Sequence, residues 1–351
     1  MLSSTTRRQA LLFAASASAL PQVAACSAQG AIAATGGLRL VTRPQRVFKI
    51  ADLPRERTEA WFVIAIAESA TEVQPELARI SITYSSNGAD VSRVEFWGEA
   101  LNAMTMRGLP APEGSFWPFG LRLVSRQPAA ANVDRMRVSV TFSDGTPALE
   151  GDIAVGVYTQ RTDLIFPFRG NGFITQSGAA NGGHRNTSGQ FAIDAMALSE
   201  NYAPQKTAAF AVNTDVVGFG REIVAPGAGT IVVARGDRPD QPVPGESNED
   251  FHLPEFRGSG DPGNHVIIDH GNGEFSMVAH FMAGSLAVRE GERVTQGQRL
   301  GALGNSGDSF APHVHHQLQD GPNWRTASGL PHRYTNIENQ RLDRGEYFTA
   351  G

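Results

Sequence analysis

Five side chains in the second half of the chain are of types that could bind a metal ion or transfer a proton. Two of them, His313 and His315, flank Val314. In a β-strand, residues two apart point to the same face, so both imidazoles are expected to enter one cleft. Both rings can bind a metal, or one can bind while the other handles a proton. A His-x-His pair alone does not establish a metal site.

The other three candidates are His184, Asp194 and His280. His184 lies in a glycine-rich loop, and Asp194 is predicted to end a strand-like run. A buried aspartate is costly unless it is paired or bound to a cation. A structural hydrogen bond to a turn is the alternative for Asp194, and a half-buried packing role is the alternative for His280. Two histidines and a carboxylate suit Zn2+, and three protein ligands leave the fourth position for water.

The first half of the chain contains no histidine, because all nine histidines lie at or beyond His184. Residues 38–160 show short period-two runs separated by Asn-Gly and Asp-Gly turns, which predicts a β-sandwich. Three tryptophans in it are candidates for core, rim or a carbohydrate surface, and the role of this domain is not evident. The predicted strands are Leu38–Thr42, Arg46–Ile50, Ala60–Ala67, Ala78–Tyr84, Val91–Trp97, Leu121–Arg126, Met136–Phe142 and Ile153–Thr159.

The second half, residues 161–351, is also predicted to be β-rich, so the fold class is all-β. Glycine becomes frequent, strand-like runs alternate with Gly-Asn turns, and no long amphipathic helix is evident. Residues 236–263 are rich in Pro, Gly and acidic side chains and are predicted to form a long surface loop between two strands.

The N-terminus has the features of an export signal. Arg7 and Arg8 precede a modestly apolar stretch, which predicts a twin-arginine-like signal peptide over residues 1–26. Cys26, the single cysteine, stands where a lipoprotein signal would be cleaved and lipidated, although an ordinary signal peptidase site is the alternative. Residues 27–37 are predicted to be a flexible linker. We therefore expect a periplasmic or cell-envelope protein, with membrane anchoring through Cys26 as an option.

The composition excludes some partners. The formal net charge of −5 over 351 residues argues against nucleic acid as the main partner. No apolar run approaches the roughly 20 residues that a spanning helix needs.

An ordered series of motifs over about residues 165–320 resembles the M23 (LytM, lysostaphin-type) peptidases. The M23 fold is an antiparallel β-sheet peptidase domain, which is therefore expected to follow the sandwich. The series comprises Val224-Ala225-Pro226, Gly263-Asn264-His265, Asp269-His270-Gly271-Asn272-Gly273, Ala279-His280-Phe281, Gly301-Ala302-Leu303-Gly304-Asn305-Ser306-Gly307 and Pro312-His313-Val314-His315.

The resemblance implies a zinc endopeptidase that hydrolyses peptide cross-links of peptidoglycan. His184, Asp194 and His315 match the zinc ligands, and His280 and His313 match the two catalytic histidines. Two departures stand out. Nine residues separate His184 from Asp194 where the family usually has three, and no tyrosine occurs in residues 173–183.

Two other functions stay open at this point. One is a non-catalytic LytM-like adaptor that binds peptidoglycan or activates another wall hydrolase. The other is a structural or assembly lipoprotein that acts through its sandwich. The remaining histidines, His252, His265, His270 and His332, are predicted to lie in loops or at a strand start, and His316 is predicted to face away from the metal.

Overall fold

The computed structural model describes residues 37–50, 58–109, 111–178, 183–252, 260–338 and 342–351. The predicted signal peptide, Cys26 and nearly all of the predicted linker lie outside these residues. No helix in the described part is long and apolar enough to cross a membrane.

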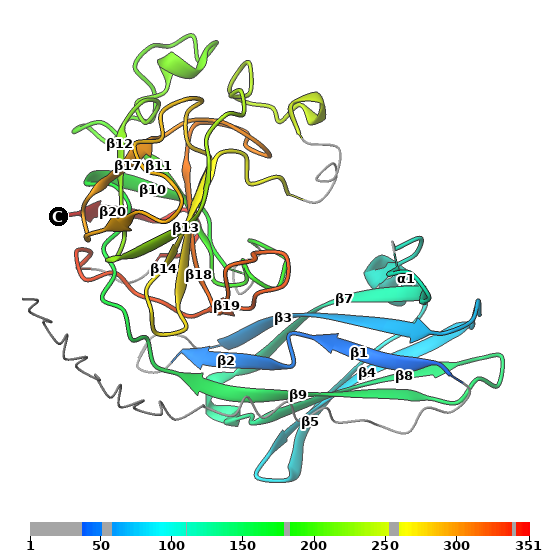
Figure 1. Cartoon of the computed structure of the whole chain (residues 1–351). Coiled ribbons are helices and arrows are strands. Elements are labelled where there is room, and N and C mark those ends of the chain that lie inside the picture. Colours follow the sequence, from blue (N-terminus) through cyan, green and yellow to red (C-terminus); the bar gives the residue numbers. More distant parts are fainter. Residues whose placement is uncertain (1–36, 51–57, 110, 179–182, 253–259, 339–341) are drawn as a thin grey trace, which may run out of the picture. The chain divides into compact units, whose positions relative to one another are not determined.

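Two β-sheets make up the N-terminal half (Figure 1). The first sheet has the strand order β1-β3-β7-β6, and the second has the order β2-β9-β8-β4-β5. A single short α-helix, α1 (Gly98–Met104), and a 3-10 helix, Ala129–Ala131, complete the described part of this half. The strands are β1 (Arg39–Arg43), β2 (Arg46–Ile50), β3 (Thr58–Ser69), β4 (Leu77–Ser86), β5 (Ala89–Phe96), β6 (Thr105–Met106), β7 (Phe116–Pro128), β8 (Arg135–Phe142) and β9 (Leu149–Tyr158).

The two N-terminal sheets share one hydrophobic core, so this half is a β-sandwich as predicted. Alternate residues of β8, beginning with Met136, are buried while their neighbours face outward, because successive side chains of a strand point to opposite faces. Core residues come from both sheets and include Trp61 of β3 and Tyr84 of β4. Trp61 is therefore a core residue, whereas Trp97 is 62% exposed. All eight predicted strands exist, and within the described residues of this half the sequence reading missed the short β6, α1 and the 3-10 helix Ala129–Ala131.

The C-terminal half contains a nine-stranded sheet with the order β16-β13-β14-β15-β18-β11-β10-β20, on which β19 also pairs with β18. Strands β12 and β17 form a separate two-stranded sheet. The bounds are β10 (Gly170–Gln176), β11 (Ile193–Ala197), β12 (Glu222–Val224), β13 (Gly229–Arg235), β14 (His265–Asp269), β15 (Phe275–Ala279), β16 (Arg293–Val294), β17 (Arg299–Ala302), β18 (Val314–Gln319), β19 (Gly329–Leu330) and β20 (Tyr347–Ala350), with 3-10 helices at Asn213–Asp215 and Glu249–Phe251.

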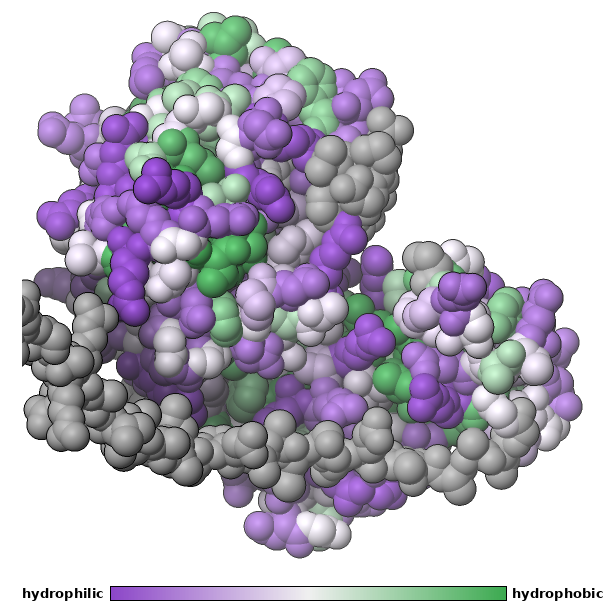
Figure 2. All heavy atoms as spheres, in the orientation of Figure 1, coloured by the Kyte–Doolittle hydropathy of each residue, from purple (hydrophilic) through white to green (hydrophobic). Residues whose placement is uncertain are grey.

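The C-terminal sheet has its own core, built from residues such as Phe166, Ile268 and Val278. The buried cores of the two halves have no residue in common. The boundary at residue 160 stays a prediction. On the face shown in Figure 2, hydrophilic side chains dominate the described surface and apolar ones form only small patches.

Two details of the sequence reading were wrong. Asp194 lies at the start of β11, not at the end of a strand, because the preceding residues form a turn. The segment 236–263 does connect two strands, β13 and β14, but it is not simply a surface loop. Its side chains Gln241 and Asp261 are almost fully buried, at 0% and 1% exposure.

Candidate metal centre

Strand register brings Asp194 and His315 together. The two residues are direct partners across β11 and β18, which run antiparallel. Side chains of directly opposite residues lie on the same face of a sheet, about 4.5–5.5 Å apart at Cβ. Accordingly, Asp194 Oδ1 lies 2.8 Å from His315 Nδ1. Residues 121 positions apart in the chain therefore meet because of the pairing alone.

His184 completes a set of three donors. It belongs to the loop between β10 and β11, and its Nε2 lies 3.1 Å from Asp194 Oδ2. The ligand atoms of His184, Asp194 and His315 all lie within 4.8 Å of one another. The nine residues between His184 and Asp194 are accommodated by a turn, in which Asn186 Oδ1 accepts the Gly189 N–H at 2.6 Å. The long spacing therefore leaves the donor set intact.

The two other candidate histidines stand beside this set. His313 Nε2 lies 3.7 Å from Asp194 Oδ2, and the rings of His280 and His313 have centroids 4.6 Å apart. The structure thus brings all five predicted residues to one place. Each of these two rings has its Nδ1 against a backbone carbonyl, Ala311 O at 2.8 Å for His313 and Ser306 O at 2.7 Å for His280.

Those carbonyls decide which ring nitrogen carries the proton. A carbonyl oxygen only accepts hydrogen bonds, so Nδ1 of each ring must be the N–H donor. In the neutral imidazole the other nitrogen, Nε2, then keeps a free lone pair. His280 and His313 are therefore both set up to accept a proton at Nε2.

Burial and neighbouring charges shift the acid–base properties of the site. Burial, followed by the neighbouring His313 and His315, lowers the pKa of His280 well below its ordinary value. Burial also lowers the pKa of His313. For Asp194, burial acts to raise the pKa, but His184 and His313 outweigh it and hold the pKa well below the ordinary value. The carboxylate is thus anionic at neutral pH, as a metal ligand must be.

His280 has an unusual backbone. Its φ is +66°, a region that residues other than glycine seldom occupy. Its N–H donates to Pro262 O at 3.3 Å, and its carbonyl accepts the Gly304 N–H at 3.0 Å. Backbone strain of this kind persists only where the surroundings over-determine it, and it is concentrated at functional sites. The segments that contain Pro262 and Ser306 therefore determine where the His280 ring points.

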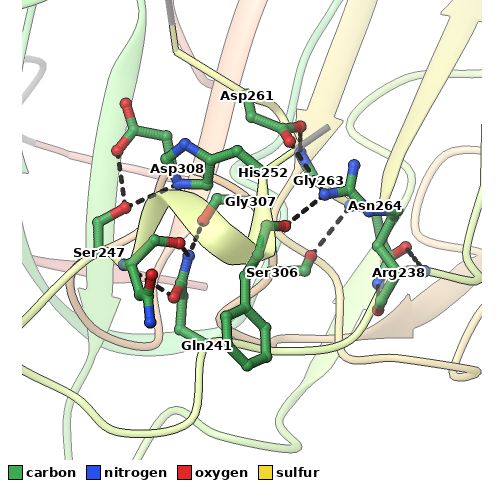
Figure 3. Close-up of polar contacts among 12 residues, drawn as sticks. Arg238, Gln241, Ser247, His252, Asp261, Gly263, Asn264, Ser306, Gly307 and Asp308 are labelled. Carbon is green, nitrogen blue, oxygen red and sulfur yellow. Dashed lines mark hydrogen bonds and ion pairs between the residues drawn. The ribbon is translucent and has the colours of Figure 1, made fainter. Parts of the chain in front are cut away.

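An ion pair that the sequence reading did not find joins the residue before Pro262 to the start of the same loop (Figure 3). Arg238 Nη2 lies 3.1 Å from Asp261 Oδ2, with side-chain exposures of 14% and 1%. Asp261 Oδ1 also accepts the Gly263 N–H, and the Asp261 backbone carbonyl accepts the Asp308 N–H, each at 2.8 Å. A Cβ on Gly263, whose φ is +58°, would lie 2.4 Å from Ser306 C, so only glycine allows this approach.

A second group of contacts joins the same loop to the same turn. Gln241 Nε2 donates to Gly307 O at 2.6 Å, and Ser247 Oγ donates to Asp308 Oδ1 at 2.9 Å. His252 Nε2 lies 3.0 Å from Ser247 Oγ, and these side chains converge in Figure 3. The loop 236–263 is therefore fastened to the turn that supports His280.

We expect Asp261→Ala to reduce the free energy of unfolding by about 3 kcal/mol, because it leaves the partly buried Arg238 guanidinium without its carboxylate. Urea unfolding measures this change. The matched control is Asp152→Ala, which removes partly exposed ion pairs with Arg135 and Arg137. The control should change stability by no more than about 1 kcal/mol. Equal effects of the two substitutions would contradict the importance of the buried pair.

His316 lies on the opposite face of β18 from His315, as predicted, and is fully buried. Its Nδ1 lies 2.6 Å from Tyr334 Oη, and its Nε2 lies 3.2 Å from Ser276 Oγ. His270 and His332 extend this network, at 2.8 Å from Ser276 Oγ and 3.0 Å from Tyr334 Oη. Among the described residues these histidines belong to no metal-ligand set.

The burial of His332 leads us to predict that the protein loses stability in acid. Burial lowers its pKa to about 4, whereas an unfolded histidine has a pKa of about 6.5. Between these values the unfolded chain binds more protons, so the free energy of unfolding should fall by up to about 3 kcal/mol as the pH drops through this window. Urea unfolding of the metal-free protein at pH 7.5 and pH 5 tests this. His332→Gln should flatten the dependence, and an unchanged slope would contradict the assignment.

The donor set fits zinc. Zn2+ binds imidazole nitrogen and carboxylate oxygen in tetrahedral sites, and catalytic sites use three protein ligands and one water. The structure supplies three converging donors and shields them from solvent, since Asp194 and His315 are 5% and 7% exposed. An antiparallel sheet that carries such a set, with two further histidines beside it, defines the class as a β-sheet domain with a candidate metal centre.

The C-terminal half of the chain is similar to peptidase family M23. The family model described as "Peptidase family M23" matches residues 211–327. This range includes His280, His313 and His315 but not His184 or Asp194, which the structure brings to the same centre.

Three proteins illustrate the similarity. Peptidoglycan DD-endopeptidase ShyA of Vibrio cholerae is 39% identical over 56 residues, which span 16% of this chain and 13% of ShyA. The catalytic domain of the prophage-encoded M23 protein EnpA from Enterococcus faecalis is 19% identical, with a TM-score of 0.28 over 46% of this chain and 88% of that domain. A zinc-containing peptidase from Vibrio cholerae is 11% identical, with a TM-score of 0.28 over 78% of this chain and 83% of that protein.

Proposed function

We propose that the protein is a zinc-dependent endopeptidase that hydrolyses peptide cross-links of peptidoglycan. The observation that carries the proposal is the convergence of His184, Asp194 and His315 on one point, with His280 and His313 beside them. The match to the family model and the local similarity to a peptidoglycan DD-endopeptidase support the choice of substrate.

Each residue has a distinct role in this proposal. His184, Asp194 and His315 would hold the metal. Bound zinc would supply a Lewis acid and lower the pKa of water to about 7. His280 and His313 present free Nε2 lone pairs, so either can take the proton of the attacking water. A ring protonated at Nε2 can then give that proton to the departing amine.

The proposal also accounts for the loops around the centre. His184 lies in the 178–192 loop, and the loop 236–263 supports His280 through Pro262 and the Ser306 turn. Phe310, three residues before His313, is 64% exposed and is available to contact a substrate peptide.

A digest of purified peptidoglycan tests the proposal. The full chain should contain about one zinc ion and release peptides whose masses identify the cleaved bond. A chelator should stop the release, and added zinc should restore it. Binding of peptidoglycan by a zinc-free protein, without release of peptides, would instead support a non-catalytic adaptor. The presence of all five polar residues in one centre favours the enzyme.

We also propose that the protein works in the periplasm or cell envelope, with Cys26 as a possible lipid anchor. The proposal rests on the signal-like sequence and on the location of peptidoglycan. Fractionation of cells that make the wild type and Cys26→Ser tests it. The wild type should sediment with membranes and the variant should be released, whereas identical distributions would exclude lipidation at Cys26.

A further inference from the structure

Strand β18, which carries His315, also carries two buried amide side chains on the same face as His315. His315, Gln317 and Gln319 of β18 alternate with residues of the opposite face, as the period of a strand requires. Gln317 and Gln319 are 3% and 0% exposed. A buried amide is costly without hydrogen bonds, so the partners of these two side chains show what they do.

The hydrogen bonds of these side chains form a continuous chain that starts at His315. His315 Nε2 lies 2.9 Å from Gln317 Oε1. Gln317 Nε2 donates to Gln319 Oε1. Gln319 Nε2 donates to the backbone carbonyl of Gly321 at 2.6 Å. The His315 ring is thus connected through two side chains to a main-chain oxygen.

The Gly321 carbonyl sets the donor-to-acceptor direction of every hydrogen bond in this chain. An amide can be placed either way round, but a carbonyl oxygen only accepts. Gln319 must therefore turn its NH2 toward Gly321 and its oxygen toward Gln317. Gln317 must in turn present its oxygen to His315. His315 Nε2 is consequently the N–H donor.

This polarity leaves His315 Nδ1 with a free lone pair in the neutral ring. That nitrogen faces Asp194 Oδ1 at 2.8 Å, so two acceptor atoms meet with no proton between them. A cation bound by both atoms would turn this unfavourable contact into a favourable one. The hydrogen-bond chain thus leaves His315 in the tautomer that can bind a metal through Nδ1.

We propose that Gln317, oriented by Gln319, is a positioning residue that holds His315 in its Nε2–H tautomer with Nδ1 directed at the metal. The inference rests on the proposed zinc site. Histidines that bind metals nearly always donate their second N–H to an oxygen, and loss of that partner typically costs 10–100-fold in metal affinity or activity. Here a pair of amides provides the oxygen.

Zinc affinity of the full chain, measured by competition with a chelating dye, tests the role of Gln317. Gln317→Leu should weaken zinc binding about 10–100-fold, because it removes the acceptor for His315 Nε2–H. Gln317→Glu keeps an oxygen at that point and should bind zinc within a few-fold of the wild type. The matched control is Gln127→Leu, at a buried glutamine of the sandwich, which should leave zinc affinity unchanged.

A double variant guards against misfolding. Gln317→Leu alone leaves the buried Gln319 oxygen without its donor. Gln317→Leu combined with Gln319→Leu removes both amides and should fold, because replacing both partners of a hydrogen bond by apolar groups can be nearly neutral. The double variant should show the same loss of zinc affinity. Zinc affinity within twofold of the wild type in a folded double variant would overturn the proposal.

The tautomer itself provides a readout that needs no zinc. Nitrogen-15 NMR of histidine-labelled protein without metal should show His315 protonated at Nε2 in the wild type and a mixture of tautomers in the double variant. If the wild type bound no zinc, the proposed function would fail, and the tautomer would still decide the inference. A wild-type His315 protonated at Nδ1 would overturn it.

Discussion

Asp194→Asn should abolish zinc binding and peptide cleavage while leaving the fold intact. The carboxylate is the one anionic donor of the set, and it lies between His184 Nε2 at 3.1 Å and His315 Nδ1 at 2.8 Å. Asparagine keeps its shape but replaces the anion by a neutral amide. Because loss of a residue that only supports a ligand costs about 10–100-fold in affinity, loss of the ligand should cost more than about 100-fold.

Metal analysis of the purified variant and a peptidoglycan digest measure this result. The matched control is Asp269→Asn, whose carboxylate accepts the Gly271 N–H at 2.8 Å in a turn away from the donor set. The control should keep both zinc and cleavage. Wild-type zinc content in Asp194→Asn would show that the metal is held elsewhere.

His313→Ala should separate metal binding from catalysis. The ring stands 3.7 Å from Asp194 Oδ2, and its Nδ1–H is taken by Ala311 O, so its Nε2 faces the centre without being one of the three converging donors. Zinc affinity should stay within a few-fold of the wild type. Cleavage should fall by about 10²–10⁴-fold, the usual contribution of a positioned acid or base.

Steady-state cleavage of a soluble cross-linked peptide measures the loss, with zinc content determined on the same sample. Added imidazole should restore part of the activity, because it can enter the space left by the side chain. His332→Ala is the matched control, since that ring lies in the network on the other face of β18. Cleavage by His313→Ala at the wild-type rate would remove His313 from the mechanism.

His280 plays a comparable role but is a less clean probe. Its backbone has a φ of +66°, and the buried Arg238–Asp261 pair supports the segments that hold it. A substitution there changes the ring and the backbone preference together. The ion pair also shows why the loop 236–263 was misread, because its polar composition suggested a solvated loop. Those polar groups instead pair with one another and with the Ser306–Asp308 turn.

Local patterns were enough to predict the strands of the N-terminal half except the short β6. Period-two alternation, as in β8, follows from strand geometry and needs no partner, so Met136 and Val138 were assignable to a core face in advance. The same alternation placed His313 and His315 on one face and His316 on the other. The order of glycine and histidine motifs was enough to indicate the family.

Gln317 shows where such patterns stop. The alternation predicts that it shares a face with His315, but a glutamine at that position is equally consistent with a solvated edge. Only its burial and the fixed polarity of its bonds to Gln319 and Gly321 reveal a role.

The sequence by itself determined which side chains can do chemistry and which face of its strand each one occupies, because both depend on residue type and local geometry. The tertiary structure decided that these side chains meet. Asp194 reaches His315 through the register of β11 and β18, and His280 is held in place by a loop that begins more than forty residues before it. Such contacts depend on the pairing of distant segments, which no local pattern specifies.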